Sequence, residues 1–180
     1  SRMPEGATDQ EIKRFNKLAQ TVVFTSQGIP FIYAGEEVYR DKKGVNNTYQ
    51  SPDSINKIYW DQKATHLDVF EYYRDLIRMR REHPAFRLTT REMVQQHLKF
   101  LDTSATPNVV AYTLNGNVNG DSWRDILVIF NGNRTSAKVT IPKNEWTLVA
   151  HDGVINLQGM GMVKDTVIMV APSSASILKK

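Results

Sequence analysis

The sequence contains no cysteine, and this absence excludes several kinds of chemistry. The chain can form no disulfide bond, hold no metal through thiolates and use no cysteine nucleophile. The absence of cysteine does not identify the cellular compartment, because exported proteins can also lack cysteine. The localisation therefore stays open. The histidines follow no metal-ligand spacing and match no nucleophile, so we expect no metal and no cofactor and interpret each as a capping or surface residue. They are His66, His83, His97 and His151.

Long hydrophobic runs and clustered positive charge are also missing. No stretch approaches the roughly 20 apolar residues of a membrane span, and residues 1–10 lack the basic and apolar regions of a signal peptide. The net charge is only +4, and the basic residues are scattered rather than interleaved with aromatics. We therefore expect neither a membrane nor a nucleic-acid partner. The chain does not begin with Met, so we expect it to start within a longer protein.

The pattern of the first 34 residues predicts α/β structure. Apolar residues at spacings of three and four predict a helix from Asp9 to Ser26, capped by Thr8 or Asp9 and ended by Gly28. These residues are Ile12, Phe15, Leu18, Ala19, Val22 and Val23. The apolar run 29–34, bounded by glycines, favours a strand buried on both faces, as in a parallel sheet.

A long polar loop and a second helix follow. Residues 36–63, which we call loop 36–63, are rich in turn formers, and the interleaved tyrosines and tryptophan argue against disorder. Loops of this length are often functional. A second helix is expected over 67–82, ended by His83 and Pro84. Its expected apolar stripe is Leu67, Phe70, Tyr73, Ile77 and Met79 or Arg80.

Beyond about residue 90 the pattern changes to short apolar or alternating runs separated by turn formers. TTREMVQQ is expected to form a short connecting helix, and the later runs predict an antiparallel sandwich or barrel. The runs are HLKFLD, VVAYTLN, DILVIFNGN, AKVTIP, EWTLVAHD, DTVIMVAP and ASILKK. The fold class is therefore α/β followed by all-β.

Glu36 and Glu37 directly follow the expected strand, where a β/α barrel builds a wall of its active site. A structural role is the competing interpretation, because Arg40, Lys42 and Lys43 lie in the same loop. We favour ion pairs with these residues, which would fix the shape of the loop.

Asn46, Asn47 and Tyr49 are candidate sugar-binding residues. Asparagine offers both a donor and an acceptor to sugar hydroxyls, and a tyrosine ring can stack on a pyranose. Two asparagines are also good turn material, so both interpretations stay open. Residues 51–53 favour a helix start capped by Ser51 or Asp53, and Trp60 is interpreted as a loop anchor.

The stretch SQGIPFIYAGEEVYRDKKGVNNTYQSPDSINKIYW closely resembles the last barrel strand, and the loop after it, of the α-amylase family of glycoside hydrolases. The GIPFIYAGEE motif is shared by much of that family. The residues from Arg40 to Trp60 resemble its debranching members, above all the type I pullulanases. HPAFRLTT, QQHLKFLD and NVVAYTLNG are similar to the junction into the C-terminal β-sandwich of those enzymes, so the resemblance covers essentially the whole chain.

The resemblance implies the end of a (β/α)8 barrel over 1–88 and a C-terminal antiparallel β-sandwich domain over 89–180. It implies an enzyme that hydrolyses α-1,6 linkages by a retaining mechanism, with three acids on earlier strands and loops. The family's His-Asp motif follows the seventh barrel strand, and this chain is expected to begin after it, so we expect a C-terminal fragment with no catalytic residue and no activity alone. Glu36 and Glu37 would support the loop, and Asn46, Asn47 and Tyr49 would bind substrate.

The expected partners are an α-glucan oligosaccharide or polysaccharide and the missing N-terminal part of the barrel. A dimer paired through strand 29–34 is a further hypothesis, because that strand would otherwise have two open edges. The alternative function is a carbohydrate-binding or purely structural sandwich module. Exposed aromatic residues on one sheet face would favour it, and Trp123 and Trp146 are the tryptophans in that region.

Overall fold

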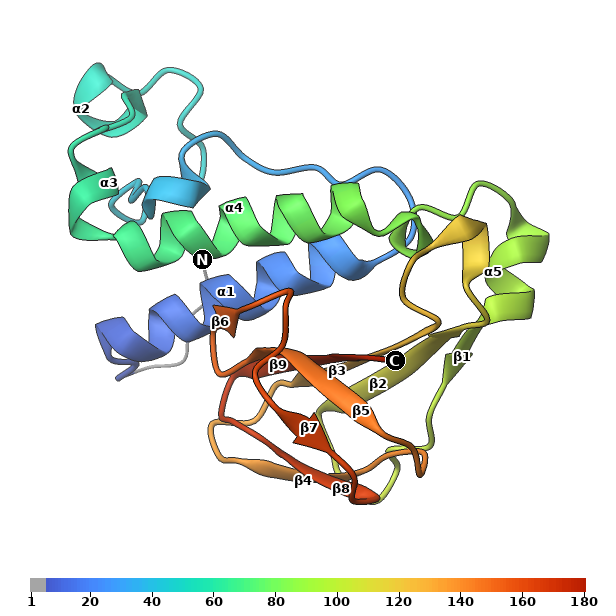
Figure 1. Cartoon of the computed structure of the whole chain (residues 1–180). Helices are drawn as coiled ribbons and strands as arrows, with labels where there is room; N and C mark the ends of the chain where they lie inside the picture. The colour runs from blue at the N-terminus through green and yellow to red at the C-terminus, as the bar shows by residue number, and fades with distance from the viewer. Residues whose placement is uncertain (1–5) are drawn as a thin grey trace.

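Two long helices lie side by side over one face of an antiparallel sheet (Figure 1). The computed structural model describes residues 6–180. Helix α1 spans Asp9–Thr25, and helix α4 spans Leu67–Glu82. Thr8 caps α1 in a capping box, because its side chain accepts from the Glu11 amide while the Glu11 carboxylate accepts from the Thr8 amide. Both predicted helices are confirmed to within one residue.

The buried faces of the helices differ from the predicted stripes. In α1 the buried residues are Gln20, Thr21, Phe24 and Thr25. In α4 they are Val69, Tyr72, Tyr73, Leu76, Met79 and Arg80. Val22, Leu67 and Ile77, which belonged to the predicted stripes, are 39%, 47% and 38% exposed. The prediction was correct for Tyr73, Met79 and Arg80, which are buried. It was wrong for the exposed residues, because the helices meet through a partly polar face, where the hydroxyl oxygens of Thr21 and Tyr72 lie 2.7 Å apart.

The strand expected over 29–34 does not form. This segment belongs to neither sheet, and Ile29 and Phe31 are 97% and 85% exposed. A strand is stabilised by a ladder of hydrogen bonds to a neighbour, and in the part of the chain described here no strand lies beside this segment. The prediction of a buried strand was wrong because an apolar run cannot supply its own partners.

Loop 36–63 contains three short helical turns, η1 (Glu36–Val38), α2 (Asp53–Asn56) and α3 (Gln62–Thr65). It lies on the side of α4 away from the sheet (Figure 1). A helix starts at Asp53 as predicted, but its N-cap is Pro52 and no side chain caps it. After α4 come η2 (Pro84–Phe86) and the expected connecting helix, α5 (Arg91–His97).

All strand pairs in the second half are antiparallel, as predicted. The larger sheet has the order β1-β2-β3-β9-β5-β6, with β7 also on β5, and the smaller sheet pairs β4 with β8. The strands are β1 (Leu98–Phe100), β2 (Val109–Asn115), β3 (Asp125–Asn131), β4 (Ala137–Thr140), β5 (Trp146–His151), β6 (Val154–Ile155), β7 (Met162–Val163), β8 (Val167–Val170) and β9 (Ser174–Lys179). The short turn η3 (Val118–Gly120) lies between β2 and β3. The two-residue strands β6 and β7 were not predicted.

Two apolar clusters cover the two faces of the larger sheet. The first lies against the helices and includes Phe24, Leu76, Phe86, Tyr112 and Ile177. The second lies against the small β4–β8 sheet and includes Leu127, Ile129, Val139, Trp146 and Val170. The helices and the sheet therefore share one core, and the domain boundary at residue 88 stays a prediction.

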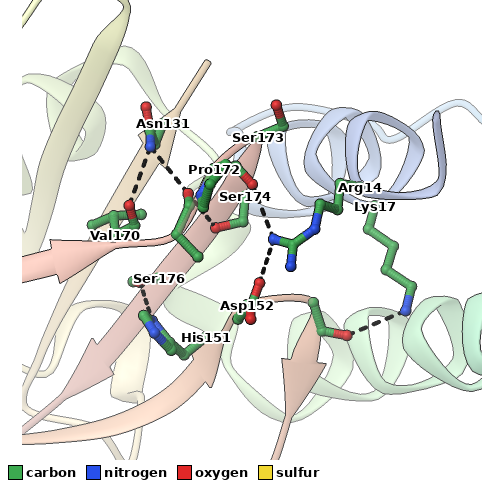
Figure 2. A network of polar contacts seen from close by, with 12 residues as sticks. Arg14, Lys17, Asn131, His151, Asp152, Val170, Pro172, Ser173, Ser174 and Ser176 are labelled. Atoms are coloured by element: carbon green, nitrogen blue, oxygen red, sulfur yellow. Dashed lines mark hydrogen bonds and ion pairs between the residues drawn. The ribbon is translucent and has the colours of Figure 1, made fainter. Parts of the chain in front are cut away.

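Polar contacts fasten α1 to the edge of the sheet (Figure 2). The Arg14 guanidinium donates to Asp152 Oδ1 at 2.5 Å and to the Pro172 carbonyl at 3.1 Å. Lys17 Nζ donates to the Gly153 carbonyl at 3.4 Å. These bonds tie the side of the helix to the β5–β6 turn and to the turn before β9.

A buried carboxylate joins the end of α4 to the sandwich. Asp121 Oδ1 lies 2.8 Å from His83 Nδ1 and also accepts from the Trp123 amide, while Oδ2 accepts from the Ala85 amide. The His83 ring stacks on Trp123 with centroids 3.4 Å apart. Burial raises the pKa of Asp121, but these hydrogen bonds outweigh it and hold the pKa below its ordinary value. His83 is the C-cap residue of α4, in agreement with its interpretation as a capping residue, but it is only 4% exposed and so is not a surface residue.

Candidate functional site

The chain enters loop 36–63 from a segment that is tightly anchored. The buried Arg80 guanidinium donates to three carbonyl oxygens at the end of α1, those of Phe24, Ser26 and Gly28, at 2.8, 2.8 and 2.5 Å. Burial, together with the nearby Arg87, lowers the pKa of Arg80. The Tyr112 hydroxyl of the sheet donates to the Thr25 carbonyl at 2.7 Å. The direction in which the chain leaves α1 is therefore set by both α4 and the sandwich.

Gly35 turns the chain at the start of the loop. Its φ is +95°, and a Cβ added there would lie 2.7 Å from Arg40 Cδ. The Arg40 guanidinium donates back to the Ala34 carbonyl at 3.1 Å. Only glycine satisfies both the backbone conformation and this close approach.

Lys42 organises the middle of the loop. Its ammonium donates to Thr48 Oγ1 at 2.5 Å and to Asn56 Oδ1 at 3.1 Å, and the Asn56 amide donates to the Thr48 and Ser51 carbonyls at 2.8 Å. The same ammonium lies 5.0 Å from the Tyr33 ring centroid, and it lowers the pKa of that phenol. These contacts hold loop 36–63 in one shape although it has few apolar residues.

The predicted sugar-binding residues lie at the exposed tip of this loop. Asn46 and Asn47 are exposed, and Tyr49 is 87% exposed. Asn47 Oδ1 accepts from the Tyr49 amide at 3.2 Å, which is an Asx turn. The structure thus brings the three residues together and presents their side chains to solvent, an arrangement compatible with both a binding role and a turn-forming role.

Glu36 and Glu37 take part in holding the loop. Glu36 Oε2 accepts from Gln20 Nε2 at 2.8 Å, and Glu37 Oε2 accepts from the Gly35 amide at 2.9 Å. Burial raises the pKa of Glu36. Within residues 6–180 neither acid forms an ion pair with the basic residues 40–43, so the predicted ion pairs were wrong. The two carboxylates instead accept hydrogen bonds from Gln20 and from the Gly35 amide.

The structure also reveals two hollows that the sequence did not predict. A cleft of about 300 Å³ lies within the loop, lined by Val38, Tyr39, Arg40, Asp41, Lys43, Tyr59 and Gln62. A groove of about 710 Å³ lies along α4, lined by Ile32, Glu37, Phe70, Tyr73, Arg74, Ile77, Arg78, Arg81 and Glu82. The sequence signal for the cleft was the pair of aromatic residues Tyr39 and Tyr59 in a polar loop.

Two other candidates can be assessed. Trp60 is 63% exposed, which argues against its interpretation as a loop anchor. No group of three or more His, Asp or Glu side chains able to hold a metal occurs between residues 6 and 180. In the same range, no helix is both long and apolar enough to cross a membrane.

Comparisons with known proteins agree with the resemblance seen in the sequence. A family model described as the all-beta domain of pullulanase matches residues 94–153. The pullulanase of Bacillus subtilis (strain 168) is 38% identical over 136 residues, which are 76% of this chain and 19% of that protein. The chain therefore spans about a fifth of the length of this curated relative.

Solved structures give the same answer. A pullulanase from Bacillus acidopullulyticus superposes on 98% of this chain and 22% of its own, with a TM-score of 0.93 and 38% identity. A pullulanase from Anoxybacillus sp. LM18-11, complexed with maltotriose, covers 97% of this chain and 24% of its own, with a TM-score of 0.86 and 31% identity. The resemblance to the debranching members of the α-amylase family is thus confirmed.

Proposed function

We propose that this chain, which belongs with the pullulanases of the α-amylase family, supplies a substrate-binding loop and the β-sandwich of a debranching glycoside hydrolase. The proposed reaction is hydrolysis of α-1,6 glucosidic linkages in pullulan-type or branched α-glucans. The proposed ligand class is supported by a related pullulanase whose structure is complexed with maltotriose.

The shape of loop 36–63 is the observation that carries this proposal. Lys42 and Asn56 hold the loop from inside through four hydrogen bonds, and its tip presents Asn46, Asn47 and Tyr49 to solvent. An exposed aromatic ring flanked by amides suits a sugar, which offers both an apolar ring face and hydroxyl groups. We therefore assign substrate binding to these three residues.

We propose that the described residues do not supply the chemistry of a retaining glycosidase. That mechanism uses two carboxyl groups about 5 Å apart, one as nucleophile and one as acid. Glu36 and Glu37 instead accept hydrogen bonds from Gln20 and from the Gly35 amide, which hold the loop. We therefore propose that the catalytic acids lie outside this chain and that the chain alone is inactive.

The exposed apolar surface supports assigning residues 1–88 to the end of a β/α barrel. Ile29 and Phe31 are almost fully exposed, and the groove along α4 has apolar walls at Phe70 and Ile77. In a barrel, neighbouring parallel strands would pair with segment 29–34 and further elements would cover the groove. A second copy of this chain paired along the same segment is the alternative occupant.

Inactivity of the chain alone gives the most direct test. The purified 180-residue chain should release no reducing sugar from pullulan, whereas the related Bacillus subtilis pullulanase serves as the positive control. Turnover by the purified chain that disappears in Glu36→Gln or Glu37→Gln would overturn the assignment of these acids to loop support.

The substrate-binding role is tested in an active enzyme that contains this chain. Tyr49→Ala should lower kcat/KM for pullulan about 10- to 100-fold, because stacking on the ring is lost, and roughly 1.4 to 2.7 kcal/mol of transition-state binding with it. Tyr49→Phe keeps the ring and should stay near the wild-type value. An unchanged kcat/KM for Tyr49→Ala would remove the tip of the loop from the site.

The alternative of a separate carbohydrate-binding sandwich finds little support in its tryptophans. Trp123 and Trp146 are 7% and 2% exposed, and both belong to the apolar core. Neither can offer a stacking surface to a sugar from the face of a sheet.

A further inference from the structure

The cleft of about 300 Å³ in loop 36–63 is distinct from the tip of that loop. Its walls come from the end of η1 and the residues that follow it, and from Tyr59 and Gln62 on the return of the loop. None of the tip residues Asn46, Asn47 and Tyr49 lines it. Its volume is at the lower end of the range for ligand pockets, about 300 to 1,000 Å³, and suits one small ring.

One wall of the cleft carries an unused hydrogen-bond donor. The Nε atom of Arg40 is buried and has no partner among residues 6–180. The other end of the guanidinium is engaged, because Nη1 donates to the Ala34 carbonyl at 3.1 Å. Buried donors are nearly always satisfied, and because Nε has almost no exposed surface, a partner from the cleft reaches it only if the Arg40 side chain shifts.

Two residues that line the cleft have unusual backbone conformations. Tyr39 and Lys43 have φ values of +60° and +51°, which are unfavourable for residues other than glycine. Tyr39 is held in place by its hydroxyl, which donates to Asp9 at 3.2 Å, and by His66, whose ring centroid lies 4.7 Å away. Burial, together with Asp9, raises the pKa of Tyr39 to about 12, so the hydroxyl keeps its proton.

The remaining walls combine an aromatic ring with planar polar groups. Tyr59 is 37% exposed, and Lys57 Nζ lies 4.4 Å from its ring centroid. Gln62 offers both a donor and an acceptor, Lys43 offers donors, and Asp41 offers acceptors. A pyranose matches this set, because it has an apolar ring face and hydroxyl groups that both donate and accept.

From these observations we infer that the cleft is a second carbohydrate subsite, which binds one glucose unit of an α-glucan. The inference rests on the proposed function for its ligand class. In this arrangement the Tyr59 ring packs on the sugar, and Gln62 and Asp41 bind its hydroxyls.

The test is a titration of the isotope-labelled 180-residue chain with maltotriose, followed by the amide resonances of the cleft and of the tip. We expect saturable shifts at residues 39–43 and 59–62. Tyr59→Ala should weaken this binding at least tenfold, while Tyr59→Phe should keep it within about threefold because the ring is retained. Phe100→Ala is the matched control, since Phe100 is an aromatic residue 70% exposed on β1, away from loop 36–63 (Figure 1).

Three outcomes would overturn the inference. Shifts confined to residues 46–49 would leave only the tip as a sugar site. A folded chain with no maltotriose-induced shifts at the cleft would contradict it outright. Shifts with inorganic phosphate but none with maltotriose would make the cleft an anion site, drawn by Arg40 and Lys43. Failure of the proposed function would be seen in a different experiment, as an unchanged kcat/KM for pullulan when Tyr49→Ala is made in the active enzyme. The outcomes of the titration can therefore be told apart from it.

Discussion

Strand β3 and segment 29–34 are two apolar runs of similar length, but only β3 forms a strand in a sheet. β3, Asp125–Asn131, is hydrogen-bonded to β2 on one side and to β9 on the other, and most of its residues are buried. Segment 29–34 has no strand partner among the described residues; Ile29, Phe31 and Tyr33 are exposed, and only Ile32 packs partly against the core. Apolar sequence alone therefore does not make a strand; neighbours on both edges do.

The largest expected difference between the two runs is in stability. Leu127 of β3 is fully buried, so Leu127→Ala should lower the free energy of unfolding by about 2 to 5 kcal/mol through lost burial and the cavity left behind. Phe31 is 85% exposed, so Phe31→Ala should change it by no more than about 0.5 kcal/mol. Urea unfolding of both variants measures this contrast.

A concentration series sharpens the same comparison. If Phe31→Ala costs more than 2 kcal/mol, and the cost grows with protein concentration, the segment is buried between copies of the chain. Light scattering on the wild-type chain would then show a dimer, which Phe31→Ala should weaken. If the chain is a monomer and Phe31→Ala does not change its free energy of unfolding, segment 29–34 is free to pair with other parts of a barrel.

The next largest effect is expected at the junction between α4 and the sandwich. Asp121→Asn should lower the free energy of unfolding by roughly 2 to 3 kcal/mol at pH 7. The Asp121 carboxylate accepts from the Ala85 and Trp123 amides and contacts His83, and an asparagine would turn a donor toward one of these groups. Thermal and urea unfolding at pH 7 measure the loss, and no loss would show that the junction does not need the charge.

The pH dependence of this variant follows from the lowered pKa of Asp121. A carboxyl group with a lowered folded-state pKa binds fewer protons when folded, so its contribution is complete above the ordinary value of 3.8. The contribution is lost as the pH falls through the lower folded-state pKa. The stability difference between wild type and Asp121→Asn should therefore shrink below pH 3.8, and a difference that stays constant down to pH 2 would contradict the pKa direction.

Sequence patterns predicted the sandwich well because its information is local. Each strand of four or more residues alternates or is continuously apolar between turn formers, and its partners lie within the same chain. β6 and β7 escaped prediction because two residues carry no period. The helix bounds were also predictable, since Thr8 with Glu11 and His83 with Pro84 are strong end signals.

The candidate site could be located from the sequence, but its contacts could not be predicted. The length and composition of loop 36–63 pointed to function, and the structure places its predicted tip residues together. The bonds that shape the loop join residues with no local pattern, such as Gln20 with Glu36 and Lys42 with Asn56. The burial of His83 could not be predicted from the sequence either, because its partner Asp121 is 38 residues further along the chain.

A smaller effect is expected where segment 29–34 turns into the loop. Gly35→Ala should cost about 2 kcal/mol, because alanine is strained at a φ of +95° and its Cβ would lie 2.7 Å from Arg40 Cδ. Gly44 is the matched control, since its φ is +75° but nothing lies within 4 Å of its added Cβ. Gly44→Ala should cost only about 1 kcal/mol. Equal costs in urea unfolding would show that the contact with Arg40 does not constrain the turn.

The smallest expected effect concerns the ion pair that ties α1 to the sheet. Arg14 and Asp152 are 28% and 44% exposed at their side chains, so solvent screens their attraction even though the atoms lie 2.5 Å apart (Figure 2). A double-mutant cycle with Arg14→Met and Asp152→Asn should give a coupling of about 0.2 to 1 kcal/mol, falling in 1 M salt. Arg14 also donates to the Pro172 carbonyl, so Arg14→Met should cost more than Asp152→Asn. A coupling above 2 kcal/mol would mean that polar contacts, rather than the shared apolar core, hold the helices on the sandwich.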